Sequence, residues 1–329
     1  MNNLMNKNNF IWKFLAVSVG SLLFVVCIIY LFAWSNNNKM QGKLVFSETY
    51  NKGLLIDKIE LVSSEDTVVI SHKNNYWVLE NKNDYYADFR LVSSLLNSIN
   101  KSIYSIKFPF NQETADKKLL NNPAKDEKNS GILIRTFIKN EKVDEIIVGL
   151  ADESENYYFS RNLKDDNIWL ISENFNFPVY SRDWIIRPII SLPAKQIEIV
   201  QIDDKQVNRL SEHTLFYDEK GMVTNIDVLT DVLSGLFVVN AVKNEQFETI
   251  KSDDMKFKNI KFTTFFGLVL DLDLYSNDKK VWCKIKLSTT TLPMTVVNDY
   301  INDNKFLYED WYFEVSPSQG HILRDFHFI

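Results

Sequence analysis

The sequence contains little cysteine, histidine, glycine or proline, and it has no excess of positive charge. Its 329 residues include two cysteines, four histidines, nine glycines and seven prolines. Two cysteines exclude a disulfide-built scaffold and a cysteine-rich zinc module. Lysine and arginine number 37 against 43 acidic residues, which gives a net charge of −6. This balance argues against a nucleic-acid-binding protein, because such proteins neutralise phosphates with a basic face.

The motifs of common enzyme classes are also missing. The chain has no Gly-x-Ser-x-Gly elbow, no phosphate-binding glycine loop and no His-Glu-x-x-His helix. His321, Asp325 and His327 share one face of a predicted terminal strand. However, 321 to 325 spans about 13 Å of extended chain, which is too far for one metal ion. We therefore predict surface positions there and assign no catalytic residue, no metal ligand and no cofactor.

Two further reactive features are best explained as structural. Asp271 and Asp273 alternate with leucines, as acids do on the solvated side of an amphipathic strand. The alternative is that this carboxylate pair performs acid–base chemistry. Cys283 has no histidine near it in the sequence, and we expect a buried, unreactive thiol.

A long apolar run lies near the N-terminus. Phe14 to Ala33 are twenty consecutive residues without a charge, and as a helix they span about 30 Å, the thickness of the hydrocarbon core of a bilayer. Trp12 and Trp34 lie at its two ends, where aromatic residues are typical of membrane interfaces. A cleaved signal peptide is the alternative, but its apolar core is normally about 7–15 residues and a small-x-small pair follows. We predict an uncleaved transmembrane helix over residues 14–34.

The charges beside this run predict its orientation. Lys7, Lys13 and the free amine precede it, which favours a cytoplasmic tail over residues 1–13. Long domains cross the membrane largely regardless of their charge. We therefore place the protein in the inner (cytoplasmic) membrane of a bacterium, with a tether at 35–55 and the rest of the chain in the periplasm.

Beyond residue 56, the chain is predicted to be mainly antiparallel β-sheet with few helices. Apolar and aromatic runs of four to eight residues alternate with clusters of Asn, Asp, Lys and Gly, as strands alternate with turns. A helix is predicted over Asp88–Lys101, because Asp88 is a good N-cap and apolar residues follow at helical spacing. A one-sided helix of this kind normally covers one face of a sheet, so the fold class is α+β.

The same order of elements is predicted twice, about 138 residues apart. Ile59–Val62 returns as Ile197–Val200, and the helix returns as Asn225–Leu236. The alternating strand Leu268–Leu274 is matched to Ile132–Ile138. We predict a tandem duplication of an α+β unit. Its boundaries are a first repeat at 56–176, a connector at 177–193, and a second repeat at 194–329 with an extra stretch at 288–304.

Two places favour contact with protein partners. Ala16 and Gly20 form a small-x-x-x-small pair that lets a second transmembrane helix approach closely, although such pairs also occur in spans without a specific contact. Arg182, Trp184 and Arg187 in the connector combine residue types that are common at binding hot spots. The alternative for the connector is that Trp184 seals the two repeats together and the arginines pair locally.

Three short motifs beyond the span form a recognisable series. They are an Ile-x-x-Ile-x-Leu strand at Ile56–Leu61, Trp77 followed by Ala87-Asp88 at a helix start, and an aromatic connector with arginines at Arg182–Pro188. In these motifs the chain resembles a bacterial family, domain-of-unknown-function family 4340, over nearly all of the part beyond the span. The proline that the family usually carries before the helix is missing, and Asn81–Asp84 stands in its place. The resemblance implies a non-catalytic envelope component that is often associated with ABC-type export systems of the gliding-motility kind.

These observations together predict a single-pass envelope protein with a non-catalytic binding ectodomain. The expected partners are the membrane itself and an envelope or ABC-transporter protein, to which this chain is an accessory. Two alternatives stay open. One is an envelope hydrolase that acts on wall or lipid substrates through Asp271, Asp273 or the C-terminal histidines. The other is a structural spacer that holds the two repeats at a set distance from the bilayer.

Overall fold

The computed structural model describes residues 40–53, 55–163, 167–186, 188–223, 225–250, 255–277 and 280–328. The predicted tail and transmembrane helix, with Ala16 and Gly20, lie outside the described residues, and so does Arg187. Among the helices of the described part, none has the length and apolar character needed to cross a membrane.

The first unit is a nine-stranded antiparallel sheet with the spatial order β4-β3-β2-β1-β6-β7-β8-β9-β5. Its strands are β1 (Lys58–Val62), β2 (Thr67–Lys73), β3 (Tyr76–Leu79), β4 (Tyr85–Tyr86), β5 (Tyr104–Pro109), β6 (Ile132–Ile138), β7 (Glu141–Ala151), β8 (Tyr157–Arg161) and β9 (Asn167–Ser172). Its helices are α2 (Ser47–Asn51), α3 (Phe89–Lys101) and α4 (Gln112–Lys117).

The second unit is another nine-stranded antiparallel sheet, with the order β13-β12-β11-β10-β15-β16-β17-β18-β14. Its strands are β10 (Ile197–Ile202), β11 (Lys205–Asn208), β12 (Phe216–Asp218), β13 (Gly221–Val223), β14 (Val238–Lys243), β15 (Lys256–Thr264), β16 (Leu268–Asn277), β17 (Lys280–Thr289) and β18 (Trp311–Val315). Its helices are α5 (Ile226–Ser234), α6 (Asn244–Ile250), α7 (Thr295–Asn304) and α8 (Pro317–Asp325).

The two sheets have the same strand order when each is numbered along the chain. The predicted mainly antiparallel sheets with few helices are therefore confirmed. The strand matching is wrong in one respect, because the sheet order makes β15 the counterpart of β6, and makes β16, with Leu268–Leu274, the counterpart of β7. Any amphipathic strand alternates in this way, so the pattern alone does not distinguish two neighbouring strands.

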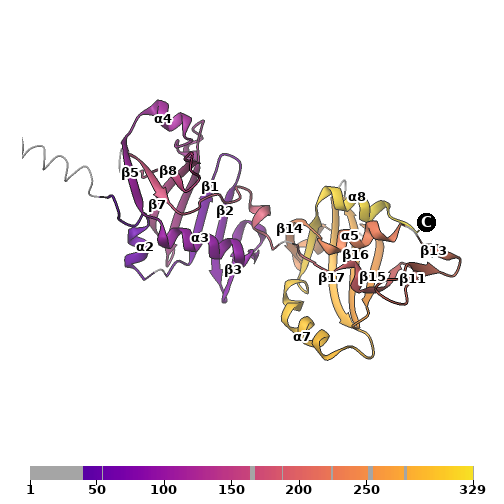
Figure 1. Ribbon diagram of the computed structural model, residues 1–329. Coiled ribbons are helices and arrows are strands. Elements are labelled where there is room, and N and C mark those ends of the chain that lie inside the picture. The colour runs from indigo at the N-terminus through magenta and orange to yellow at the C-terminus, as the bar shows by residue number, and fades with distance from the viewer. Residues whose placement is uncertain are drawn as a thin grey trace, which may run out of the picture.

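Both predicted helices form, and their apolar sides explain where they lie. The Asp88 side chain accepts a hydrogen bond from the Arg90 backbone N–H at 2.9 Å, which caps α3. Val92 and Leu95 on α3 are fully buried, as is Leu233 on α5. Figure 1 shows α3 across the first sheet and α5 beside α8 on the second.

Two segments differ from the sequence prediction in their secondary structure. Residues 40–53, assigned to the tether, contain α2 and carry Phe46 at 1% exposure, so they pack on the first unit. His321 and Asp325 lie on α8 rather than on a strand. Pro317 at the start of α8 explains the difference, since proline is favoured in the first turn of a helix. The argument that placed His327 on the same strand face is therefore wrong.

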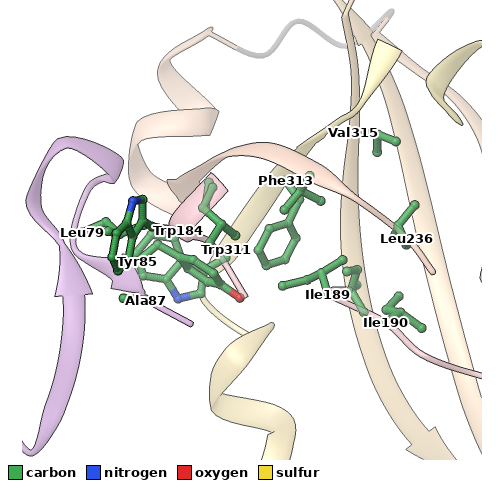
Figure 2. Packing of buried hydrophobic residues seen from close by; sticks show 14 of the residues in the cluster. Leu79, Tyr85, Ala87, Trp184, Ile189, Ile190, Leu236, Trp311, Phe313 and Val315 are labelled. Carbon is green, nitrogen blue, oxygen red and sulfur yellow. The ribbon is translucent and has the colours of Figure 1, made fainter. Parts of the chain in front are cut away.

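The two units share one continuous hydrophobic core. The connector runs between them and forms an isolated bridge on each side, Ala87 with Ile185 and Ile190 with Leu236. Trp184 has no exposed surface, and Figure 2 shows it close to Tyr85 at the junction. The connector is therefore part of the core.

Candidate functional site

A cavity of about 600 Å³ lies where the two units meet. The first unit contributes residues around the β2–β3 turn and β4, and the second contributes the start of α6 and the segment before β18. An adjoining cavity of about 270 Å³ shares Tyr76, Tyr86 and Phe306 with the larger one. We call the two cavities together the junction site.

The turn between β2 and β3 places one of these rings at the rim. Asn74 and Asn75 have φ of 50° and 68°. A two-residue hairpin loop with both central residues at positive φ is a type I′ turn, in which asparagine is favoured. Lys73 and Tyr76 pair at the end of the hairpin, and Tyr76 is 45% exposed. The two-residue turn therefore fixes the position of Tyr76 at the end of the hairpin, where its ring is partly exposed to solvent.

Three aromatic rings from the two units meet at the junction site. The Tyr76 ring centroid lies 5.1 Å from that of Tyr86 and 5.3 Å from that of Phe306. Tyr86 and Phe306 are 5.0 Å apart and meet edge to face. These separations are in the favourable range for aromatic pairs. The rings form one cluster, although Phe306 is 220 residues beyond Tyr86 in the sequence.

Buried contacts below this cluster fix the two units against each other. Tyr85 is fully buried, and its ring lies edge to face with that of its neighbour Tyr86 at 5.5 Å. Its ring meets Trp311 at 4.9 Å and Phe313 at 5.4 Å, both edge to face (Figure 2). Its hydroxyl donates to the Leu307 carbonyl at 3.3 Å. The shape of the junction site therefore depends on Tyr85.

The charges that line the larger cavity are mainly negative. Lys73 donates to Asp84 at 2.8 Å, and this hydrogen bond raises the pKa of Lys73. The remaining charged lining consists of Lys243 and three exposed acids, Glu245, Glu309 and Asp310. The site therefore favours a cationic group.

A buried lysine, Lys284, links the segments on the second unit's side of the cavity. Lys284 Nζ donates to Asn244 Oδ1 at 2.5 Å and to the Glu309 carbonyl. Asn244 starts α6, while Glu309 belongs to the segment that leads into β18. Burial lowers the pKa of Lys284 to about 8. These bonds tie two lining segments to β17.

The predicted connector patch is not assembled as one surface. Trp184 is fully buried and donates its indole N–H to the Pro178 carbonyl at 2.9 Å. Arg182 lies over the Tyr180 ring at 4.5 Å and lines a different, shallow cavity with Lys82 and Glu314. Trp184 is therefore a core residue at the junction, as the alternative for the connector proposed.

The two acids on β16 belong to a charge network. Asn259 Nδ2 donates to Asp271 at 2.6 Å and to Asp273 at 2.9 Å. Asp273 also accepts from Lys256 at 2.5 Å and from Lys286 at 2.9 Å. Burial raises the pKa of Asp273, but the hydrogen bonds from the lysines and Asn259 outweigh it and lower this pKa to about 2. Asp273 is therefore an ionised partner of two lysines at neutral pH.

This network gives a prediction about stability in acid. A carboxyl group whose pKa is lower in the folded state stabilises the fold above its ordinary pKa, and this contribution is lost as the pH falls through the folded value. We expect Asp273→Asn to remove about 2 kcal/mol of stability at pH 6 and far less at pH 2. Urea unfolding of both proteins across this range measures the difference, with Asp271→Asn as the matched control. A difference between Asp273→Asn and wild type that does not change with pH would contradict the assignment.

The other reactive residues singled out in the sequence lie apart from the junction site, and a further histidine, His72, lies at it. Cys283 is fully buried, and burial raises its pKa to about 12. His72 lines the smaller cavity and lies 5.2 Å from the Trp77 ring. Within the described ranges, no group of three or more His, Cys, Asp or Glu side chains is placed to hold a metal ion.

Sequence reasoning missed Tyr76, Tyr86 and Phe306. The Asn74-Asn75 pair is a turn signal that could have placed Tyr76 at a hairpin end. Nothing local connects either tyrosine with Phe306, because the cluster depends on how the two units pack. Comparisons with known protein families, curated proteins and solved structures found no match for this chain.

Proposed function

We propose that this chain is a single-pass membrane protein that binds another envelope protein at its junction site. It acts as a non-catalytic accessory component of an ABC-type transport system. The observation that carries the binding proposal is the partly exposed aromatic cluster to which both units contribute, Tyr76, Tyr86 and Phe306. Aromatic residues are enriched at the centres of protein–protein interfaces.

The chemistry of the site supports a particular kind of partner segment. Tyrosine is enriched at binding hot spots, where a few rings supply most of the binding energy. The exposed acids Glu245, Glu309 and Asp310 line the same cavity as these rings. An extended segment that carries apolar and lysine or arginine side chains matches both features, since cations are attracted to acids and to aromatic faces.

The membrane and transport parts of the proposal rest on the sequence. The uncharged run Phe14–Ala33 has the length of a membrane-spanning helix, and Lys7 and Lys13 before it favour a cytoplasmic tail and a periplasmic C-terminal part. The transporter role is what the resemblance to family 4340 implies. The identical strand order of the two sheets supports a tandem duplication of one α+β unit.

The junction site is tested by removing one exposed ring. We expect Tyr76→Ser to weaken partner binding about 5- to 30-fold, because loss of a hot-spot ring costs about 1–2 kcal/mol. The full-length protein is extracted from its native membranes in mild detergent, and co-purifying membrane proteins are quantified by mass spectrometry. Tyr217→Ser is the matched control, since Tyr217 lies on β12, the counterpart of β3, and is 47% exposed against 45% for Tyr76.

Each outcome bears on a separate part of the proposal. Loss of one membrane protein from the Tyr76→Ser sample, with its retention by Tyr217→Ser, supports the junction site. Equal recovery from both variants contradicts the site. If wild type recovers no membrane protein, the binding function is wrong, and if the partner is not a transporter subunit, the accessory role is wrong.

A further inference from the structure

The second unit contains a separate, mainly apolar cavity of about 240 Å³. It lies between the end of the connector, the β15–β17 part of the sheet, and α7. Most of its lining is aliphatic, with Leu192, Leu268, Leu270, Leu287 and Val297 among the residues that face it. An apolar pocket of this size that opens at the surface needs an explanation, because apolar side chains are normally packed against other elements.

The corresponding place on the sheet of the first unit is filled, and paired residues show which positions of the two units correspond. Thr136 pairs with Ile59, and Thr264 pairs with Ile197, so the two threonines are counterparts. Their local hydrogen bonds agree, because the Asp144 N–H donates to Thr136 Oγ1 at 3.3 Å and the Leu268 N–H donates to Thr264 Oγ1 at 3.0 Å. Leu268 therefore occupies the position of Asp144.

In the first unit, helix α2 packs on this pair. Thr49 on α2 is fully buried, and its hydroxyl lies 2.8 Å from Thr136 Oγ1. The Thr49 backbone N–H donates to Asp144 Oδ2 at 2.7 Å. Asp144 thus anchors α2, and α2 fills the space above the sheet.

Within the part of the chain that the structure describes, the second unit has neither a counterpart of this helix nor its anchoring aspartate. Ile59 lies 15 positions after the bridge residue Leu44, whereas Ile197 lies only seven positions after the corresponding Ile190. The shorter segment has no room for a counterpart of α2, and leucine replaces the anchoring aspartate. The space is instead partly covered by α7, and Thr264 and Leu268 line the cavity.

We propose that this cavity binds a single acyl chain of a lipid or lipidated molecule, independently of the junction site. The lining selects an apolar ligand, and the replacement of Asp144 by Leu268 removes the group that would hold a polar one. At about 240 Å³, the cavity exceeds the ~150 Å³ of an engineered apolar cavity that binds benzene. Because α7 already covers part of this space, a slender alkyl chain fits it better than a helix such as α2.

The surface beside the cavity suits the part of a lipid that stays outside. Val296 lines the cavity and is 64% exposed. Leu292 and Met294, which precede it, are 93% and 55% exposed. An exposed apolar rim of this kind often marks a ligand or membrane interaction site. These exposed side chains therefore provide an apolar path along which the outer end of the bound acyl chain can run from Val296 toward solvent.

The proposal is tested with a fatty acid of ten to twelve carbons that carries a photoreactive diazirine. The full-length protein is reconstituted in nanodiscs and irradiated with the probe, and the labelled peptides are identified by mass spectrometry. We expect labelling of peptides that contain residues 264–270 or 295–300. A second arm uses a phosphatidylglycerol with a diazirine in one acyl chain, which distinguishes a free fatty acid from a bilayer lipid as the source.

Two matched variants make the result specific. Val296→Glu places a charge at the mouth and should lower this labelling at least fivefold. Val228→Glu changes a 49%-exposed valine on α5 and should leave the labelling of the cavity peptides unchanged. Because both positions are on the surface, both variants are expected to fold. Equal labelling of the two variants, or wild-type label outside the cavity peptides only, would overturn the proposal.

Discussion

Replacing Tyr85 with alanine is expected to lower the free energy of unfolding by about 3–5 kcal/mol, the usual cost of deleting a large buried ring. Tyr85 is fully buried and lies edge to face against Trp311 and Phe313 of the second unit. Its removal leaves a cavity in the core that joins the units, and it also leaves the Leu307 carbonyl without its donor. Urea unfolding of the full-length protein, followed by tryptophan fluorescence, measures the change.

Two further variants separate packing from hydrogen bonding at this position. Tyr85→Phe keeps the ring and loses the hydroxyl, so we expect a cost of about 1 kcal/mol. Tyr50→Ala removes a ring that is 53% exposed on α2, and a change below about 1 kcal/mol is expected there. If Tyr85→Ala cost no more than Tyr50→Ala, the junction would not be the stabilising interface described above.

The parts of the fold that were predicted correctly depend on local patterns. The cap at Asp88 and the apolar residues of α3 follow directly from helical geometry. Alternation along β1, with Ile59 and Leu61 buried, follows from the two-residue period of a strand. Such signals need no knowledge of distant residues, so a single sequence carries them.

The features that were missed depend on contacts between distant segments. The aromatic cluster needs Tyr86 and Phe306 to meet across two units, and no local pattern encodes that packing. The cavity under α7 exists because α2 has no counterpart in the second unit, which only the paired strands reveal. Arg182 and Trp184 are near neighbours in the sequence but lie in different environments. Their residue types therefore suggested a surface that the fold does not assemble.

Replacing Gly149 with alanine is expected to destabilise the first unit by about 3 kcal/mol or more, at or above the usual range for overpacking. A Cβ at Gly149 would lie under 3.0 Å from the backbone oxygens of both Lys118 and Leu119. These oxygens cannot move away easily, because the Leu150 N–H donates to the Lys118 carbonyl at 3.1 Å. Glycine is therefore required where the segment after α4 crosses β7. Gly235→Ala is the control, since its nearest neighbour is 3.8 Å away. Equal urea midpoints for the two variants would show that this crossing is not tightly packed.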